Sequence, residues 1–589
     1  MKQDYYKNLQ SEAAAQLEKY VQQANRYTLY RTICFFALLF AFAAAYDGLV
    51  AAGIIGLFML LLFCQLIRQH NRLKQQIQLV QNALAVTDNY LAHFNGHWQE
   101  LADKGEDFYA PNRPQDIDLH IFGKASLYQY LCCCRTALGR QKLAKALTVT
   151  PPSPAVITQR QKAVAELLER QRLCVELLAR SRRLPDGHDT AALIAEINGQ
   201  HHRYISHMLQ RTAWLLPLLT FASLGLALLD FSSWQIPGLL MLLQFAIAML
   251  FQRQNQAILA PLMSINHELH AYQALFIHLG ETNFTNKSLQ KTADTLSQEA
   301  APALQKLARL ADHVNLCRNL FFYVLGNALL LWDCHCAARF ARWQDNAAQN
   351  LAGWLNLWAE MELYISLAMT GHTRENYTFP QLLAGPPTLK VDGLTSLLLD
   401  EKKAIPNDTF MQAETRIITG SNMSGKTTYM RTLASSLVLA YAGAPVCAKA
   451  FACSPMHIFT SIQVHDDQSQ GISTFYAELL RIKQMVDFSK KKLPMFIAID
   501  EIFKGTNSAD RIIGAREAIK RLTRPYAITL VSTHDFELCD LQSANEVPVT
   551  NYHFAEYYED NKIKFDYKIK NGRCQTTNAQ YLLKMAGIL

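Results

Sequence analysis

The residues best suited to chemistry begin with a glycine-bounded loop in the last third of the 589-residue chain. The loop consists of Gly420, Ser421, Asn422, Met423, Ser424, Gly425, Lys426, Thr427 and Thr428. Its pattern, GxxxxGK[ST], lets backbone N–H groups surround phosphate oxygens at the N-terminus of a helix, where the partial charge is positive. We therefore expect Lys426 to reach the β- and γ-phosphates of a nucleotide, and the Thr427 hydroxyl to bind Mg²⁺.

A pair of carboxylates, Asp500 and Glu501, follows later in the chain, directly after the apolar run 495–499. Asp500 is placed to hold Mg²⁺ through water, and Glu501 to orient the attacking water and accept its proton. His534 follows another apolar run, 527–532, where it could sense the γ-phosphate or hold the water. A histidine taken alone is more often structural, but its place beside two nucleotide motifs favours a catalytic role.

These groups need elements that bring them together, and each group follows a short apolar run of strand-like composition. The predicted strands are 416–419, 495–499 and 527–532, and the helix expected after the loop is 429–441. Before about residue 385 no strand-like alternation occurs, and apolar residues instead recur at spacings of three and four. The first two thirds of the chain is therefore predicted to be helical.

Two long apolar stretches interrupt this helical part. The first, 32–67, is broken only at Asp47-Gly48. As one helix it would measure about 54 Å, far more than a hydrocarbon layer of about 30 Å, whereas two helices meeting at the break approach the required length. The second stretch, 213–251, is broken around 230–238 and leaves two arms at the short end of the range for membrane spans.

Basic residues flank both stretches, whereas the two turns carry none. The flanking residues are Arg26, Arg31, Arg68, Arg72, Lys74, Arg203, Arg211 and Arg253. By the positive-inside rule both hairpins enter the bilayer from the cytoplasm and return to it, which predicts a multi-pass protein of the inner (plasma) membrane. A long buried helix pair in a soluble domain is the alternative. A third apolar stretch, 320–332, is shorter and contains Asn327, so we expect a core helix there.

Composition and charge agree with a folded protein of several domains. Half of the residues are hydrophobic, 18% are charged, and neither Gly nor Pro is enriched, which excludes collagen-like and mostly disordered chains. The net charge of +8 is spread along the chain and permits an anionic partner without requiring one. We predict three parts: 1–80 with an N-terminal helix and the first hairpin, 81–380 with a helical core and the second hairpin, and 381–589 with a cytoplasmic nucleotide-binding domain. The fold class is therefore α + α/β.

The nucleotide motifs resemble the ATPase domain of the MutS mismatch-repair family, which belongs to the ABC-type ATPases. The likeness lies in TGSNMSGKTT (419–428), STFYAE (473–478), DEIFKGT (500–506), Thr533-His534 and the C-terminal segments 551–554 and 586–588. Upstream the likeness continues more weakly to about residue 120. The resemblance implies ATP as the nucleotide, with Mg²⁺, and it places Asn407 against the adenine.

The same resemblance implies a dimer. In ABC-type ATPases each nucleotide lies between the phosphate-binding loop of one subunit and a signature segment of the other, which makes Ser473 the expected trans-acting residue. The chain has one such loop and one such segment, so a homodimer with two composite sites follows. The alternative is that Ser473 is merely the N-cap of the helix expected at 475–487.

The chain departs from the MutS family where that family recognises DNA. The N-terminal mismatch-binding domain has no counterpart, and the second apolar hairpin replaces at least part of the DNA-gripping clamp. We favour a membrane-anchored MutS-like ATPase whose cycle moves its helical body. The alternatives are a repair or recombination protein that binds mismatched or branched DNA at the membrane, and an ABC-type transport ATPase, for which four short spans scarcely form a path. Steeply salt-dependent DNA binding would distinguish the first two functions.

Overall fold

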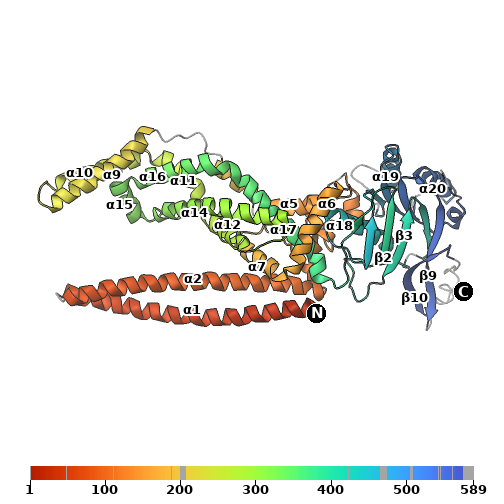
Figure 1. Cartoon of the computed structure of the whole chain (residues 1–589), viewed down its shortest axis with the longest axis horizontal. Helices are drawn as coiled ribbons and strands as arrows, with labels where there is room; N and C mark the ends of the chain where they lie inside the picture. The colour runs from red at the N-terminus through yellow and green to blue at the C-terminus, as the bar shows by residue number, and fades with distance from the viewer. Residues whose placement is uncertain are drawn as a thin grey trace.

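The structure, a computed structural model, describes residues 2–47, 50–110, 112–187, 189–198, 207–421, 423–463, 474–503, 508–541, 543, 546–559 and 562–574. The helices up to residue 373 occupy one side of the elongated molecule, and the β-sheets with the helices between their strands occupy the other (Figure 1). Along the chain, the described elements are helical up to residue 373, and the first strand begins at residue 381. The expected combination of a helical part and an α/β part is therefore present, while the exact domain boundaries stay a prediction.

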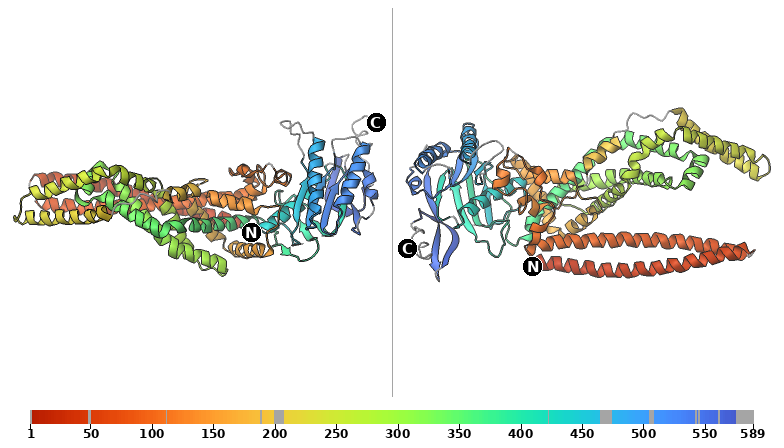
Figure 2. Two further views of the ribbon diagram at one scale, coloured as in Figure 1. Left: turned by 90° about the horizontal axis from the view of Figure 1, so that it is seen from above. Right: turned by 180° about the vertical axis from the view of Figure 1, so that it is seen from behind.

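The N-terminal hairpin consists of two long antiparallel helices, α1 (Lys2–Tyr46) and α2 (Val50–Phe94). They run side by side, and the N-terminus lies near the junction between the helical part and the sheets (Figures 1 and 2). At this base the rings of Tyr6 and Tyr90 stack with centroids 4.4 Å apart, and both side chains are buried. The Lys2 ammonium donates to the carbonyl oxygen of Gly371 at 2.6 Å, which ties the start of the chain to the helical body.

The other end of the hairpin exposes its apolar side chains. Phe36, Phe40, Ile54 and Leu61 are 64%, 81%, 69% and 64% exposed. A helix that is apolar all round is normally buried in a core or in a bilayer. By length and composition three helices could cross a membrane, namely Lys2–Tyr46, Ala51–Phe94 and Arg211–Leu228, or up to five spans if each of two bent helix pairs is one span. These spans are found among the described residues.

The helical body follows the hairpin. Its α-helices are α3 (Gln115–Asp118), α4 (Leu127–Leu131), α5 (Ala137–Ala146), α6 (Pro154–Glu169), α7 (Gln171–Ser181), α8 (Thr190–Asn198), α9 (His207–Leu228), α10 (Gln235–Leu250), α11 (Gln252–Ser264), α12 (Asn266–Gly280), α13 (Lys287–Asp294), α14 (Ala301–Leu316), α15 (Leu320–Leu330), α16 (Trp332–Trp343) and α17 (Gln349–Thr373). The core of the body includes the buried rings of Tyr272, Phe276, Phe340 and Trp358. The long helix α17 runs through this core and extends toward the sheets.

Helices α9 and α10 form the second predicted hairpin. They lie at the end of the molecule farthest from the sheets, as does the turn end of the α1–α2 pair (Figures 1 and 2). Leu218 and Leu239 are 68% and 70% exposed. Between the two helices the Gln244 amide donates to the Thr220 hydroxyl at 2.6 Å, and both side chains are buried. This hydrogen bond between polar side chains joins the two arms of an otherwise apolar hairpin.

The expectation of a core helix at 320–332 is wrong. Helix α15 packs against α10 through the Tyr323 ring, whose centroid lies 6.5 Å from that of Phe245. Its outer face is exposed: Leu320 is 76%, Phe321 69% and Phe322 51% exposed. A sharp bend of 81° separates α15 from the helices that follow it. The prediction from length and Asn327 failed because a short apolar helix can lie beside a hairpin instead of inside a core.

Among the described residues of the C-terminal part there are two sheets and three α-helices. The strands are β1 (Gln381–Leu382), β2 (Thr388–Leu394), β3 (Asn407–Gln412), β4 (Thr415–Thr419), β5 (Ala450–Cys453), β6 (His457–Ser461), β7 (Met495–Asp500), β8 (Ala527–Ser532), β9 (Val549–Glu559) and β10 (Lys562–Asn571). The helices are α18 (Lys426–Ala442), α19 (Thr474–Ser489) and α20 (Ser508–Leu522). One sheet has the strand order β1-β5-β2-β3 and the other β10-β9-β4-β8-β7-β6. All three strands expected from the sequence are present, in the second sheet.

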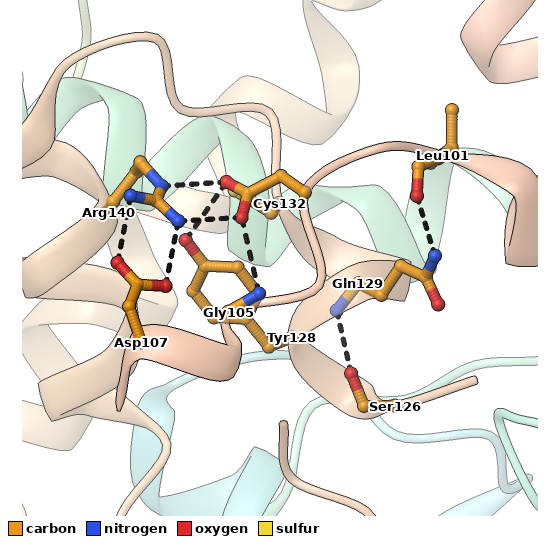
Figure 3. Close-up of polar contacts among 9 residues, drawn as sticks. Leu101, Gly105, Asp107, Ser126, Tyr128, Gln129, Cys132 and Arg140 are labelled. Atoms are coloured by element: carbon orange, nitrogen blue, oxygen red, sulfur yellow. Dashed lines mark hydrogen bonds and ion pairs between the residues drawn. The ribbon is translucent and has the colours of Figure 1, made fainter. Parts of the chain in front are cut away.

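An ionic cluster fastens the segment between the N-terminal hairpin and α5. The Arg140 guanidinium donates to both carboxylate oxygens of Asp103 at 2.8 Å and to those of Asp107 at 3.0 Å (Figure 3). Asp103 also accepts from the Tyr128 hydroxyl at 3.2 Å. Burial tends to raise the pKa of Asp103, but the hydrogen bonds and charge of Arg140 outweigh it and hold that pKa below its ordinary value. The segment that contains α3 is thereby fixed to the helical body.

A buried carboxylate in α17 joins this helix to the start of α5. Glu362 accepts hydrogen bonds from the backbone N–H of Arg135 at 2.9 Å and from the Thr136 hydroxyl. A Cβ on Gly139 would collide with the same carboxylate, so a larger residue there would displace Glu362 from its present position. Burial raises the pKa of Glu362 to about 7, against the hydrogen bonds from Thr136 and Arg135, which lower it.

Because the pKa of Glu362 is higher in the folded than in the unfolded chain, its protonation favours folding. This stabilisation is complete below about pH 4.5 and is lost as the pH rises through about 7. We expect the Glu362→Gln variant, which stays neutral, to lose this component of the pH dependence, a difference of about 3 kcal/mol across the range. The measurement is the unfolding temperature of the detergent-solubilised protein from pH 5 to pH 8.5. Glu360→Gln is the matched control, and a Glu362→Gln curve that parallels the wild type would contradict the assignment.

Candidate nucleotide site

The site lies where the carboxyl ends of neighbouring parallel strands meet. In the register of the second sheet, Ile418 of β4 pairs with Ser532 of β8, and Ser532 pairs with Asp500 of β7. The glycine loop, the Asp500-Glu501 pair and His534 each follow one of these strand ends. Crevices at the carboxyl ends of parallel strands are the usual place for ligands in α/β sheets. The topology thus brings together the groups that the sequence places far apart.

The loop after β4 turns sharply at two glycines. Gly420 has φ +142° and Gly425 has φ +103°, in the left-handed region that favours glycine. A Cβ on Gly420 would lie 2.9 Å from the carbonyl oxygen of Phe554, so close approach also requires glycine there. Gly425 is the N-cap of α18, whose first N–H groups point toward the loop's interior by the geometry of a helix N-terminus. The helix begins at Lys426, three residues before the expected start.

Lys426 is buried inside this loop. Its ammonium donates to the carbonyl oxygens of Gly420 at 2.6 Å and Ser421 at 2.8 Å. The Ser424 hydroxyl also donates to the carbonyl oxygen of Ser421, at 2.8 Å, and these hydrogen bonds close the loop. The positive charge therefore lies within the curve of the loop, beside the N-terminus of α18, where an anion would be stabilised.

The two residues expected to hold Mg²⁺ are adjacent. The Thr427 hydroxyl donates to the Asp500 carboxylate at 2.8 Å, and the Ser532 hydroxyl donates to the other oxygen of that carboxylate. A hydroxyl and a carboxylate at this separation are oxygen donors of the kind that Mg²⁺ prefers. The residues present therefore fit the ion that the sequence predicts, and Ser532 is a further member of the site.

The two candidate catalytic residues are also in contact. The imidazole Nε2 of His534 lies 3.1 Å from the Glu501 carboxylate. Glu501 has φ +52° and Phe503 has φ +62°, unusual values for residues with side chains. The Glu478 carboxylate accepts from the Phe503 backbone N–H at 2.6 Å, and Ser532 accepts from the Glu501 N–H at 3.1 Å. These bonds hold a strained backbone in place at the site, a common feature of functional residues.

Asn407 uses its side chain to bind another strand. Its amide donates to the carbonyl oxygen of Tyr567 at 2.9 Å and accepts from the Ile569 N–H at 2.9 Å. The Tyr567 ring lies beside the loop, because a Cβ on Gly425 would be 3.1 Å from it. Contact of Asn407 with adenine stays a prediction. Tyr567 is an aromatic residue near the loop, and the sequence pattern did not indicate it.

A buried aspartate links the helical body to this site. Asp118 of α3 is fully buried and accepts from the Thr460 hydroxyl at 2.7 Å and from the N–H groups of Ile462 at 3.1 Å and Gln463 at 2.9 Å. The Arg481 guanidinium of α19 donates to the same carboxylate at 3.1 Å. The backbone carbonyl of Asp118 accepts from Arg431 of α18 at 2.7 Å. One residue of the body therefore contacts three elements of the nucleotide domain.

Some predicted site residues lie outside the described part of the chain. These are Asn422, Ser473, and residues 504–506 and 586–588 of the motifs. The described loop residues Met423 and Thr428 are exposed, with Met423 at 75%. Helix α19 begins at Thr474, directly after the predicted signature residue. The trans-acting role of Ser473 stays a prediction.

Two residues of the site had no recognisable sequence pattern, namely Ser532 and Asp118, which are polar residues of kinds that are common everywhere in proteins. Glu478, in contrast, is the last residue of the STFYAE motif at 473–478. Asp118 lies 363 residues from its partner Arg481, so no local spacing could have indicated the pair. The one available signal is the position of Ser532 at the last residue of an apolar run, directly before Thr533-His534.

Comparison with protein families identifies the C-terminal part independently. Residues 416–588 match the model of MutS domain V, the ATPase-type domain of its family. The matched region contains the glycine loop, Asp500, Glu501 and His534, whereas Asn407 and the helical body lie before it. The strand-end site described above occurs within the same region. The C-terminal part of the chain, residues 416–588, is therefore similar to the ATPase-type domain of the MutS family.

Proposed function

We propose that the protein is a membrane-anchored ATPase of the MutS family, which binds and hydrolyses ATP and couples this cycle to movement of its helical body. The observation that carries the ATPase proposal is the meeting of Lys426, Thr427, Asp500, Glu501 and His534 at adjacent strand ends. The support for this proposal is the arrangement of these residues, and the match to MutS domain V agrees with it.

The side chains divide the work of hydrolysis. Lys426 and the N-terminus of α18 bind the β- and γ-phosphates of ATP. Thr427 and Asp500 would hold Mg²⁺, which would neutralise the developing phosphate charge when bound. Glu501 accepts the proton of the attacking water, and His534, 3.1 Å away, orients that carboxylate.

Membrane anchoring is supported by the exposed apolar helices. The outer halves of α1 and α2 and the α9–α10 hairpin expose large apolar side chains at the end farthest from the ATPase-type domain. Basic residues flank these stretches and are missing from their turns at Asp47 and 230–235. The proposed topology has both hairpins entering the inner (plasma) membrane from the cytoplasm, with the ATPase-type domain in the cytoplasm.

Coupling is proposed to pass through Asp118. Its carboxylate binds the end of β6 and Arg481 of α19, and these two elements border residues 464–473, which contain the predicted signature residue Ser473. Its carbonyl binds α18, the helix that begins at Lys426. A displacement of α19 or α18 during the ATP cycle would therefore act directly on α3 and, through the Arg140 cluster, on the helical body.

Homodimerisation completes the proposal. Each chain supplies one glycine loop and one predicted signature segment, so two copies would form two composite sites. Ser473 of one copy would then contact the nucleotide held by Lys426 of the other. DNA binding, a property of the MutS family, is a second candidate that the same assays test by adding duplex DNA.

The first prediction for this function concerns the chemistry. We expect Lys426→Ala to weaken ATP binding at least about tenfold, because the phosphates lose a buried positive charge. Glu501→Gln should bind ATP but lower the hydrolysis rate at least about 100-fold, because an amide cannot accept the proton. Binding and phosphate release are measured on the full-length protein in detergent, with Lys390→Ala, an exposed lysine of the other sheet, as the control.

The same variants test the composite site. With ATP bound, Glu501→Gln is expected to be a dimer by light scattering, because hydrolysis no longer releases the nucleotide that joins the copies. A Glu501→Gln protein that stays monomeric at saturating ATP would contradict the composite site. Wild-type hydrolysis by Glu501→Gln would instead contradict the assignment of the base.

The second prediction concerns topology. Cysteines introduced at Asp47 and Ser233 should react with a membrane-impermeant maleimide in intact cells, in a background where the exposed Cys64 is replaced by serine. The thiol introduced by Lys390→Cys, on strand β2, should react only after the cytoplasmic side is opened. Labelling of Ser233→Cys only after opening would place α9 and α10 on the cytoplasmic side.

The third prediction concerns coupling. We expect Asp118→Asn to leave ATP affinity within about threefold of the wild type, yet to abolish the effect of ATP on amide hydrogen exchange in α5 and α17. An asparagine cannot accept all of the bonds from Ile462, Gln463 and Arg481, so the body is released from the ATPase-type domain. Asp116→Asn is the matched control, since Asp116 is buried two residues earlier and pairs with Arg113. An unchanged ATP effect in Asp118→Asn would refute this route.

A further inference from the structure

A cavity of about 760 Å³ opens between α14, α16 and the start of α17. Four of its lining residues are cationic at neutral pH: Lys306 and Arg309 from α14, and Arg339 and Arg342 from α16. Each pair is spaced three residues apart, so both members face the same side of their helix. The two helices therefore direct four positive charges toward one concave space, with Glu299 as the acidic residue in its lining.

These cations are not neutralised by carboxylates within the described part of the chain. None of the four forms an ion pair there, and all four side chains are exposed. Elsewhere in the same body, basic side chains such as Arg170 and Arg172 pair with carboxylates. Close like charges repel one another, and that repulsion is relieved when an anion binds.

Tryptophans fix the walls of the cavity. The Trp343 indole N–H donates to the carbonyl oxygen of Ala303 at 2.9 Å, which joins the end of α16 to the start of α14. The Trp332 indole N–H donates to the carbonyl oxygen of His313 at 3.1 Å, which joins the other ends of these helices. The spacing between the two basic helices is thus held by two hydrogen bonds, so the arrangement of charges exists before any ligand binds.

The cavity lies beside the apolar surface of the body. Helix α15 connects α14 to α16 and carries the exposed residues Leu320, Phe321 and Phe322. His313, in the cavity lining, lies in the last turn of α14, and Leu320 is the first residue of α15. Helices α14, α15 and α16 lie together near α9 and α10 in Figure 1. A positive pocket next to exposed hydrocarbon, with Trp332 between them, has the composition of a membrane interface.

We propose that this cavity binds the phosphate-containing headgroup of an anionic phospholipid from the cytoplasmic leaflet. The proposal rests on the membrane anchoring proposed above. Guanidinium and ammonium groups both attract phosphate through their positive charge, and basic pockets on the cytoplasmic side of membrane helices bind acidic headgroups. The acyl chains of such a lipid would lie on the apolar surface of α15 and α10. The lipid would then join the helices on either side of the α15 bend.

The shape and surroundings of the cavity favour a lipid over a nucleic acid. A duplex presents regularly spaced phosphates along its length, and proteins bind it through extended basic surfaces. Here the charges converge on one space, and the neighbouring surface is apolar. A nucleic acid would leave that apolar surface uncovered, whereas a phospholipid covers it with its own hydrocarbon.

The test compares two triple variants with the same change in net charge. The cavity variant is Arg309→Gln/Arg339→Gln/Arg342→Gln. The control variant, Lys145→Gln/Lys162→Gln/Lys291→Gln, removes exposed cations of the helical body that lie outside the cavity. Full-length proteins in neutral detergent are titrated with dioctanoyl phosphatidylglycerol, dioctanoyl phosphatidylcholine, inorganic phosphate and a duplex oligonucleotide. Bound molecules are counted by native mass spectrometry, and affinities are measured by thermophoresis.

We expect wild type and control to bind phosphatidylglycerol, and the cavity variant to bind it at least about tenfold more weakly. Phosphatidylcholine and inorganic phosphate should not compete at equal concentration, because each lacks either the net charge or the hydrocarbon. A second cavity variant with lysines at the three arginine positions should keep affinity within about threefold of the wild type. Its retention would also show that loss in the glutamine variant reflects charge and not misfolding.

Several outcomes would overturn the proposal. Equal phosphatidylglycerol binding by the cavity and control variants would remove the cavity as the site. Competition by inorganic phosphate would make it a site for the free ion, and a loss of duplex binding without a loss of lipid binding would make it a nucleic-acid site. Extraction of the wild-type protein from membranes by alkaline carbonate would instead refute membrane anchoring itself. A protein that resists carbonate but shows no charge-dependent lipid binding would refute only the present inference.

Discussion

The burial of one carboxylate, that of Asp118, sets how the two halves of the protein are joined. A charge removed from water is very costly unless hydrogen bonds and an opposite charge replace its hydration. Asp118 meets that requirement through groups of the ATPase-type domain, namely Thr460, two backbone N–H groups and Arg481. If the halves separated, the Asp118 carboxylate would lose these hydrogen-bond partners, and the Arg481 guanidinium would lose its carboxylate. The contact therefore opposes separation of the two halves, which supports the proposed coupling between the domain and the body.

The candidate nucleotide site likewise depends on a small number of contacts. Parallel pairing of β4, β8 and β7 places three strand ends side by side, and the side chains after them need little further positioning. Polar side chains supply the remaining positioning. Ser532 fixes both Asp500 and the backbone of Glu501, and Glu478 holds Phe503. The positive φ angles of Glu501 and Phe503 are maintained by these bonds. Strained backbone at this point is consistent with a site built for chemistry instead of for stability alone.

The sequence predicted the parts of this molecule that depend on local pattern. The strands around 416–419, 495–499 and 527–532 and the break near Asp47 follow from runs of apolar residues and from turn residues. It could not predict contacts between distant segments, such as Asp118 with Arg481 or Asn407 with β10. It also misjudged α15, because hydropathy and length do not reveal which neighbour a short helix packs against. The four cations of α14 and α16 look like ordinary surface residues until the fold brings the two helices together.

The bond between Lys2 and the body has a consequence for the making of the protein. The Lys2 ammonium binds the carbonyl oxygens of Gly371 and Arg374, which are among the last residues of the helical body to be synthesised. At roughly 5 to 20 residues per second, the ribosome needs about 20 to 75 s to pass from Lys2 to Gly371. During that interval α1 and α2 can pair with each other through Tyr6 and Tyr90, but the partners of Lys2 in the body do not yet exist. The contact of Lys2 is therefore one of the last contacts of the helical body that can form.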